Sequence, residues 1–148
     1  LRFTLDHCTQ GHIDPAALVG KAEGMIVGPF LYVADKQEVE DVSFSTAAAL
    51  HKAGLKVAIA SDWPIIPMEL FPLQAGLSLR DGLSEGDVWK MITVNPAEIL
   101  GIADRVGTIE EGKDADIVLF NGNPLRQIGV YAQTTIINGQ IVYSAEKE

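Results

Sequence analysis

The stretch KVAIASDWP, residues 56–64, gives the first indication of the fold. Residues 57–60 are small or β-branched and apolar, and they lie between Gly54 and Pro64. A short apolar run bounded in this way predicts a fully buried strand. Asp62 follows at the point where this strand leaves the core. The acid either caps the next turn or lies at the rim of a site, and its position alone leaves both interpretations open.

The sequence before this stretch alternates between strand and helix patterns. RFTLDH (2–7) predicts a strand over Arg2–Asp6, and MIVG (25–28) predicts the next one. PAALVGKAE (15–23) predicts a helix that Asp14 caps and Gly24 closes, and SFSTAAALHKAG (43–54) predicts a second helix. We expect a loop from Pro29 to about Asp41. Strand–helix–strand–helix–strand order is typical of parallel strands in an α/β fold.

The next segment is predicted to be helical. LFPLQAGLSLRDG (70–82) indicates a helix after Pro72, and SEGDVWKMITVNP (84–96) indicates another. Ser84 and Asp87 form a capping-box pattern at the start of the second helix. We expect Asn95 and Pro96 to break this helix and to restart it as PAEILG.

The composition changes after Gly107 to a pattern of short strands. One strand is predicted over Asp116–Phe120, and TTIINGQIVY (134–143) predicts a hairpin. Asn138-Gly139 between two apolar runs is a strong hairpin signal. We therefore expect two parts, an α/β part over residues 1–104 and an antiparallel β part over residues 105–148.

Composition and charge narrow the classes of function. Of 148 residues, 47% are hydrophobic and 21% are charged, which is typical of a globular protein. The 11 basic and 20 acidic residues give a net charge of −9, which argues against nucleic acid or an anionic membrane as partner. No apolar run reaches the roughly 18 residues of a membrane-spanning helix. The single cysteine, Cys8, fits a reducing compartment, so we expect the cytoplasm. Because Leu1 begins directly in strand-like sequence, we also expect the chain to be cut from a longer one.

Two polar residues fall at predicted strand ends, where parallel α/β folds place their sites. His7 ends the first strand and Asp62 ends the third. An imidazole and a carboxylate on one sheet edge could share a divalent metal or act as an acid–base pair. His12 could be a second ligand or a substrate contact, or a solvated loop residue. Trp63 could line a pocket or belong to the core.

Four segments resemble the metal-dependent amidohydrolases, especially the imidazolonepropionase-like and dihydroorotase-like groups. NPAEILGIADRVGTIEEGKDADIVLFNGNPL (95–125) resembles their C-terminal signature. LDHCTQGH (5–12), VGPFLYVADKQEV (27–39) and VAIASDWP (57–64) resemble their sixth, seventh and eighth barrel strands, in that order. The resemblance implies an α/β fold made of the last three β/α units of a TIM-like barrel plus a small C-terminal β-sandwich portion.

The resemblance also implies roles for individual residues. His7 matches the sixth-strand histidine that ligates metal. Asp62 matches the eighth-strand aspartate that binds metal and moves the proton while an activated water attacks an amide or cyclic amide. His12 and Trp63 are the candidate substrate contacts from their loop positions alone, and the resemblance adds only that relatives commonly carry another polar residue at the position of Trp63. Zinc is the first expectation for the metal, with iron or manganese as alternatives.

The departures from the family pattern concern the remaining ligands. The His-x-His after the first barrel strand, the bridging residue of the fourth strand and the histidine of the fifth have no counterpart in these residues. A whole barrel takes about 250 residues. We therefore expect the 148-residue chain to show little catalysis alone, and to assemble as a homo-oligomer or with a missing N-terminal half.

Two other interpretations stay open at this point. The chain could be a non-catalytic remnant that binds a partner. It could also be an unrelated doubly wound α/β domain in which Asp62 is a phospho-acceptor or a magnesium ligand.

Overall fold

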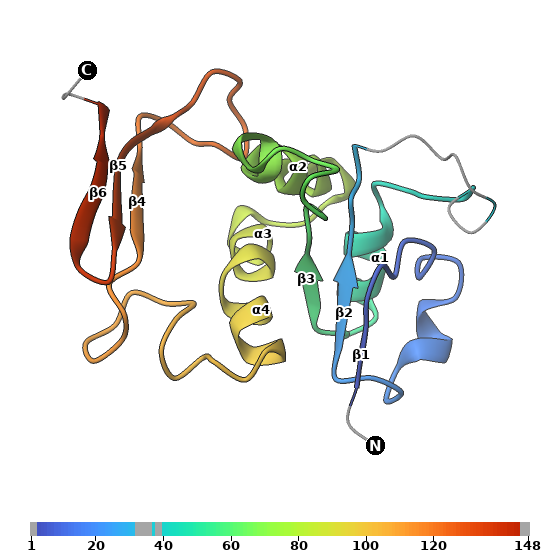
Figure 1. Cartoon of the computed structure of the whole chain (residues 1–148). Helices are drawn as coiled ribbons and strands as arrows, with labels where there is room; N and C mark the ends of the chain where they lie inside the picture. Colours follow the sequence, from blue (N-terminus) through green and yellow to red (C-terminus); the bar gives the residue numbers. More distant parts are fainter. Residues whose placement is uncertain (1–2, 32–36, 38–39, 146–148) are drawn as a thin grey trace.

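The computed structural model describes residues 3–31, 37 and 40–145 of the chain. Two separate three-stranded sheets lie at opposite ends, with helices between them (Figure 1). The elements in chain order are β1 (Thr4–Leu5), β2 (Gly24–Val27), α1 (Thr46–Lys52), β3 (Val57–Ile59), α2 (Phe71–Gly76), α3 (Glu85–Ile92), α4 (Val94–Ile99), β4 (Ile117–Phe120), β5 (Ala132–Ile137) and β6 (Gln140–Ser144). Short 3₁₀ helices span Pro15–Leu18, Met68–Leu70 and Leu77–Asp81.

The first sheet is parallel, in the order β1-β2-β3, which confirms the α/β prediction. Its register aligns Leu5 with Met25, and Met25 with Val57. Met25, Val27 and Val57 have no exposed surface. β3 packs between α1 on one side and α3 and α4 on the other, so this sheet forms the centre of the core (Figure 1).

The first predicted helix is much shorter than its pattern suggested. Asp14 does cap it, because its Oδ1 accepts a hydrogen bond from the Ala17 amide at 3.2 Å. Only Pro15–Leu18 is helical, however, and Gly20 already has a positive φ of 72°. Gly24 does not close a helix but begins β2.

The middle of the chain is helical as predicted, with different breaks. Residues 70–82 form α2 followed by a 3₁₀ helix rather than one helix. The predicted capping box is confirmed at α3, where Ser84 and Asp87 exchange both bonds. α3 ends at Ile92 and α4 begins at Val94, so the break falls before Asn95 and Pro96. Pro96 occupies the first turn of α4, where its missing N–H costs no helical hydrogen bond.

The second sheet is antiparallel, in the order β4-β5-β6. Asn138 and Gly139 turn between β5 and β6 with φ of 50° and 75°, which confirms the hairpin. This sheet exposes apolar side chains to an unusual degree. Those at least two-fifths exposed on its strands are Val118, Leu119, Ile137, Ile141, Val142 and Tyr143.

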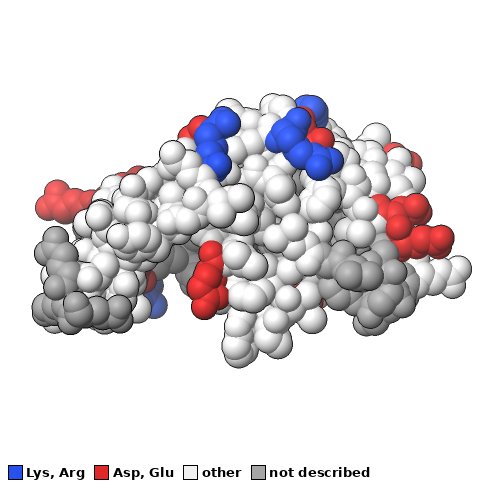
Figure 2. Space-filling view, turned by 90° about the horizontal axis from the view of Figure 1, so that it is seen from above, with Lys and Arg blue, Asp and Glu red and all other residues white. Residues whose placement is uncertain are grey.

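The surface seen from above is weakly charged. Lys and Arg side chains and Asp and Glu side chains lie there in small separate groups on a mostly uncharged face (Figure 2). Among the described residues, no helix is long and apolar enough to cross a membrane. The predicted loop after Pro29 includes residues 32–36 and 38–39, and the predicted first strand includes Arg2; these lie outside the described residues.

Candidate functional site

His7 lies directly beyond β1 in a tightly held turn. Its backbone has a φ of 50°, and the next amide, that of Cys8, donates to the Ile26 carbonyl of β2 at 2.9 Å. The His7 Nδ1 lies 3.3 Å from the Gly28 carbonyl oxygen. A carbonyl oxygen can only accept, so Nδ1 is the donor in this contact. In the neutral ring the other nitrogen, Nε2, then keeps its lone pair, as a metal ligand must, and it lies 4.0 Å from Oδ2 of Asp6.

Asp62 lies beyond β3 in a similar turn. Its φ is 51°, and its carbonyl accepts a hydrogen bond from the Ile65 amide at 2.8 Å. Its side chain is exposed, while Ser61 just before it is buried. The strand is thus buried up to its end, and the acid projects from that end.

The strand order places β2 between these two residues. Neighbouring strands are about 4.8 Å apart, so the ends of β1 and β3 are separated by roughly 10 Å. Gly28 follows β2 directly and has a φ of 121°. A Cβ atom on Gly28 would lie only 2.2 Å from the Ala60 carbonyl oxygen, so this position admits no side chain.

His12 lies on the same loop as His7 but is held by a different element. Its Nδ1 lies 2.8 Å from Oγ1 of Thr46, the first residue of α1. The Thr46 hydroxyl also donates to the Thr9 carbonyl at 2.9 Å. His12 is therefore fixed rather than freely solvated.

Three other side chains with possible chemistry have different surroundings. Trp63 is 68% exposed, so it is not part of the core. Cys8 is partly buried, and that burial raises the pKa of its thiol. His51 lies 3.7 Å from Asp87 on the helical side of the molecule. Within the described residues, no group of three or more His, Cys, Asp and Glu side chains could hold a metal ion.

One residue that supports the site was not predicted from the sequence. Gln74 of α2 is fully buried, and its Oε1 accepts a hydrogen bond from the Phe30 amide at 2.8 Å. Its Nε2 donates to the Ala60 carbonyl at 3.0 Å. Gln74 thus ties the segment after β2 to the segment that carries Asp62. Only a polar residue inside an apolar helix pattern could have indicated it.

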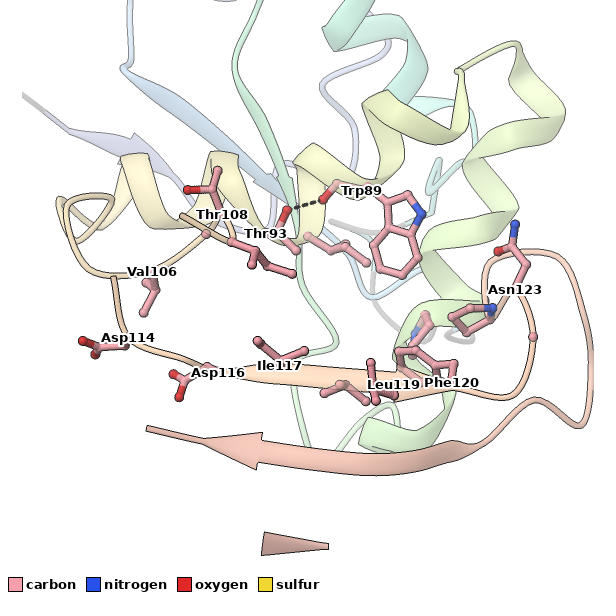
Figure 3. A pocket seen from close by; sticks show the side chains of 17 residues that line it. Trp89, Thr93, Val106, Thr108, Asp114, Asp116, Ile117, Leu119, Phe120 and Asn123 are labelled. Atoms are coloured by element: carbon pink, nitrogen blue, oxygen red, sulfur yellow. Dashed lines mark hydrogen bonds between the residues drawn. The ribbon is translucent and has the colours of Figure 1, made fainter. Parts of the chain in front are cut away.

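A groove of about 990 Å³ lies away from the strand ends. Trp89 and Thr93 of α3 and its C-cap line one side, and Ile117, Leu119 and Phe120 of β4 line the other (Figure 3). The Thr93 hydroxyl donates to the Trp89 carbonyl at 2.7 Å, which turns this polar group away from the groove's apolar lining. None of His7, His12, Asp62 and Trp63 lines this groove.

Comparison with known proteins identifies the family of the chain. A model of the amidohydrolase family matches residues 2–142. The chain therefore belongs to the amidohydrolase family, which excludes the unrelated doubly wound domain.

Its individual relatives include imidazolonepropionases. The imidazolonepropionase of Geobacillus kaustophilus is 35% identical over 109 residues, which cover 68% of this chain and 26% of that protein. A solved amidohydrolase from Thermotoga maritima MSB8 superposes with a TM-score of 0.89 and 38% identity, over 95% of this chain and 37% of that one. A zinc-bound adenosine deaminase from Xanthomonas campestris shares the fold, with a TM-score of 0.67 and 20% identity over 95% of this chain and 37% of that one. The chain spans about a quarter of the length of the curated relatives it matches.

Proposed function

We propose that the chain is the C-terminal portion of a metal-dependent hydrolase that cleaves a carbon–nitrogen bond in a small amide or cyclic amide. Membership of the amidohydrolase family and the similarity to imidazolonepropionases support this proposal. The observation that carries it is the placement of His7 and Asp62. Both follow strands of one parallel sheet at its carboxyl edge, and both have a left-handed backbone.

In this proposal the parallel sheet and its helices are the last three β/α units of a TIM-like barrel. The antiparallel sheet is part of a β-sandwich, with the boundary near residue 104. The superposition on the Thermotoga maritima structure over 95% of the chain supports this reading. The single cysteine supports the cytoplasm as the compartment.

His7 and Asp62 are the proposed ligands of a divalent metal. Their chemistry fits this role, because His7 offers the lone pair of Nε2 and Asp62 offers an exposed carboxylate. When bound, a divalent metal makes water acidic enough to attack at neutral pH. Zinc is the metal we propose first, since histidine and carboxylate are common zinc ligands and a relative of the same fold was solved with zinc.

Asp62 is the proposed proton carrier of the reaction. Its carboxylate takes a proton from the attacking water and delivers it to the leaving nitrogen. The hydrogen bond from Gln74 to the Ala60 carbonyl holds the segment that carries Asp62 in place for this transfer. His12 and Trp63 are the proposed substrate contacts on the two flanking loops.

The other ligands of the site must come from polypeptide that corresponds to the rest of the relatives. The solved relative is matched over only 37% of its length. The groove beside β4 is a suitable docking place for that polypeptide, because β4 is an edge strand with apolar side chains facing the groove. We propose that this polypeptide fills the groove and that the 148 residues alone turn over little substrate. A homo-oligomer that buries the groove is the competing outcome.

The test compares the 148-residue chain with the product of the longest reading frame that contains it. Both are assayed with a panel of amides and cyclic amides, with and without added zinc. We expect metal-dependent hydrolysis only in the longer product, with a loss of at least about 1000-fold in Asp62→Asn. His7→Gln should weaken zinc binding, and His51→Gln is the matched control. Full activity in Asp62→Asn would contradict the proposal.

A non-catalytic assembly is the second candidate. It would show tight, metal-independent association with a separately made N-terminal half and no hydrolysis of any amide tested.

A further inference from the structure

The side chain of Thr46 contacts both His12 and the backbone of the loop after β1. Thr46 begins α1 and has no exposed surface. Its Oγ1 lies 2.9 Å from the Thr9 carbonyl oxygen and 2.8 Å from Nδ1 of His12. The loop after β1 is thus joined to the start of α1 through a single buried hydroxyl.

The hydrogen atoms in this chain of contacts can be assigned by counting. A threonine hydroxyl has one proton, and a carbonyl oxygen can only accept. The Thr46 proton therefore points to Thr9, so the hydroxyl oxygen must accept the proton of His12 Nδ1. The reverse arrangement would leave the Thr9 carbonyl without this partner, and Thr9 is only 7% exposed. An unpaired buried acceptor costs about 1–3 kcal/mol.

The assignment decides what the other nitrogen of His12 can do. With the proton on Nδ1, the neutral ring carries a lone pair on Nε2. No hydrogen bond to Nε2 is found within the described part of the chain, and the ring is only partly buried. His12 also lies on the loop that follows β1, at the carboxyl edge where His7 projects.

We propose that Thr46 is a positioning residue that holds His12 as the Nδ1–H tautomer, so that Nε2 accepts a hydrogen bond from an N–H group of the substrate. This inference rests on the proposed function for the identity of the donor. It narrows the substrate class to amides that carry an N–H group, as opposed to fully N-substituted ones. It also gives His12 a role separate from metal binding.

The test is an NMR measurement of the His12 ring nitrogens in the ¹⁵N-labelled chain, without metal. We expect wild-type His12 to be protonated on Nδ1 at neutral pH. Thr46→Ser keeps the hydroxyl and should keep this tautomer. Thr46→Val removes the hydroxyl and should let the Nε2–H tautomer of His12 become populated. A backbone amide spectrum confirms that each variant is folded. A wild-type His12 protonated on Nε2, or an unchanged tautomer in folded Thr46→Val, would overturn the assignment.

The substrate role is tested on the same spectra with two probes. Hydantoin offers N–H groups, and 1,3-dimethylhydantoin has the same ring without them. We expect hydantoin to shift the Nε2 resonance of His12 and the dimethyl compound to leave it unchanged. Equal shifts with both probes, or none with hydantoin, would overturn the acceptor role. Because neither spectrum depends on metal or turnover, these results are separate from the hydrolysis test of the proposed function.

Discussion

His7 and Asp62 have a backbone conformation that most side chains avoid. Among the described non-glycine residues, only Asn138 in the hairpin turn shares their positive φ. A left-handed residue costs roughly 1–2 kcal/mol unless it is glycine, with Asn, Asp and His the most tolerant. Two such residues lie at one edge of one sheet. Strain of this kind is found mainly at functional sites.

The residue-scale prediction concerns Gln74. Gln74→Ala should lower the free energy of unfolding by about 2–4 kcal/mol, because it leaves the Phe30 amide and the Ala60 carbonyl without their partner. Urea unfolding followed by circular dichroism measures this change.

Gln133→Ala is the matched control, since Gln133 is exposed on β5. It should change the free energy of unfolding by less than about 0.5 kcal/mol. Similar losses in the two variants would show that the Gln74 bridge contributes little.

The positions of His7 and Asp62 after strands could be predicted from the sequence, because an acid or a histidine after an apolar run is a local pattern. It could not place Gln74 or Thr46, whose hydrogen bonds join residues 44 and 37 positions apart. Such contacts depend on how the elements pack, and no short pattern encodes them. The metal-binding roles of His7 and Asp62 and the substrate roles of His12 and Trp63 stay predictions.

At the scale of single elements, predictions from apolar runs and turn residues were the most accurate. β2, β3 and the β5–β6 hairpin follow their patterns closely, because burial and the Asn-Gly turn are local signals. The helix expected over 15–23 was wrong beyond Leu18. None of the four helical residues is fully buried, and Gly20 takes a conformation that a helix cannot contain.

The capping box of α3 should make the stability of this helix sensitive to acid. The hydroxyl of Ser84 donates to Asp87 at 2.6 Å and holds the pKa of that carboxyl below its ordinary value of 3.8. A group with a lowered pKa contributes fully above its unfolded-state pKa, and its contribution is lost as the pH falls through the folded-state value. Wild type should therefore lose more stability than Asp87→Asn between pH 7 and about pH 3.

Urea unfolding of both proteins at the two pH values measures this difference. Glu111→Gln, at an exposed loop position, removes the same charge and should behave like wild type. Equal acid losses in wild type and Asp87→Asn would contradict the prediction.

The end of β2 allows a comparison of two glycines. Gly28→Ala should cost more than about 3 kcal/mol or prevent folding, because the new Cβ would meet the Ala60 carbonyl oxygen at 2.2 Å. Gly54→Ala should cost only about 1–2 kcal/mol, since Gly54 has a φ of 82° but no atom within 4 Å of the new Cβ. Thermal unfolding of the two variants measures this difference. Equal losses of stability would show that the backbone near Ala60 can move to accommodate the new side chain.

At the scale of the whole molecule, the chain leaves a large apolar surface uncovered. The groove between α3 and β4 and the exposed side chains of the second sheet lie in the same part of the structure (Figures 1 and 3). Exposed apolar patches of this kind are typical of surfaces that bind another polypeptide. Helices pack closely against β2 and β3 of the first sheet, whereas no helix of the described residues packs as closely against β4, β5 or β6.

Leu119→Lys tests whether this groove is open in solution. The residue is 51% exposed and lines the groove, so a charge there should be tolerated by the fold. We expect it to reduce the binding of an apolar fluorescent dye several-fold.

Val142→Lys introduces the same charge at a residue that is 56% exposed and outside the groove. It should leave most of the dye binding intact. Equal effects of the two substitutions would mean that the dye does not report on the groove.

The two proposed metal ligands are attached to the sheet with unequal firmness. β1 and β3 each pair only with β2, but β1 has two residues that are not buried, whereas β3 is buried throughout and packed between helices. Strands with few buried contacts open at a small fraction of the free energy needed for global unfolding. The amides around His7 should therefore exchange with solvent long before those of β3. A metal ion bound to both residues would then hold the end of β1 in place. The dissociation rate of that ion would be governed by the opening of β1 rather than by its release from the Asp62 carboxylate.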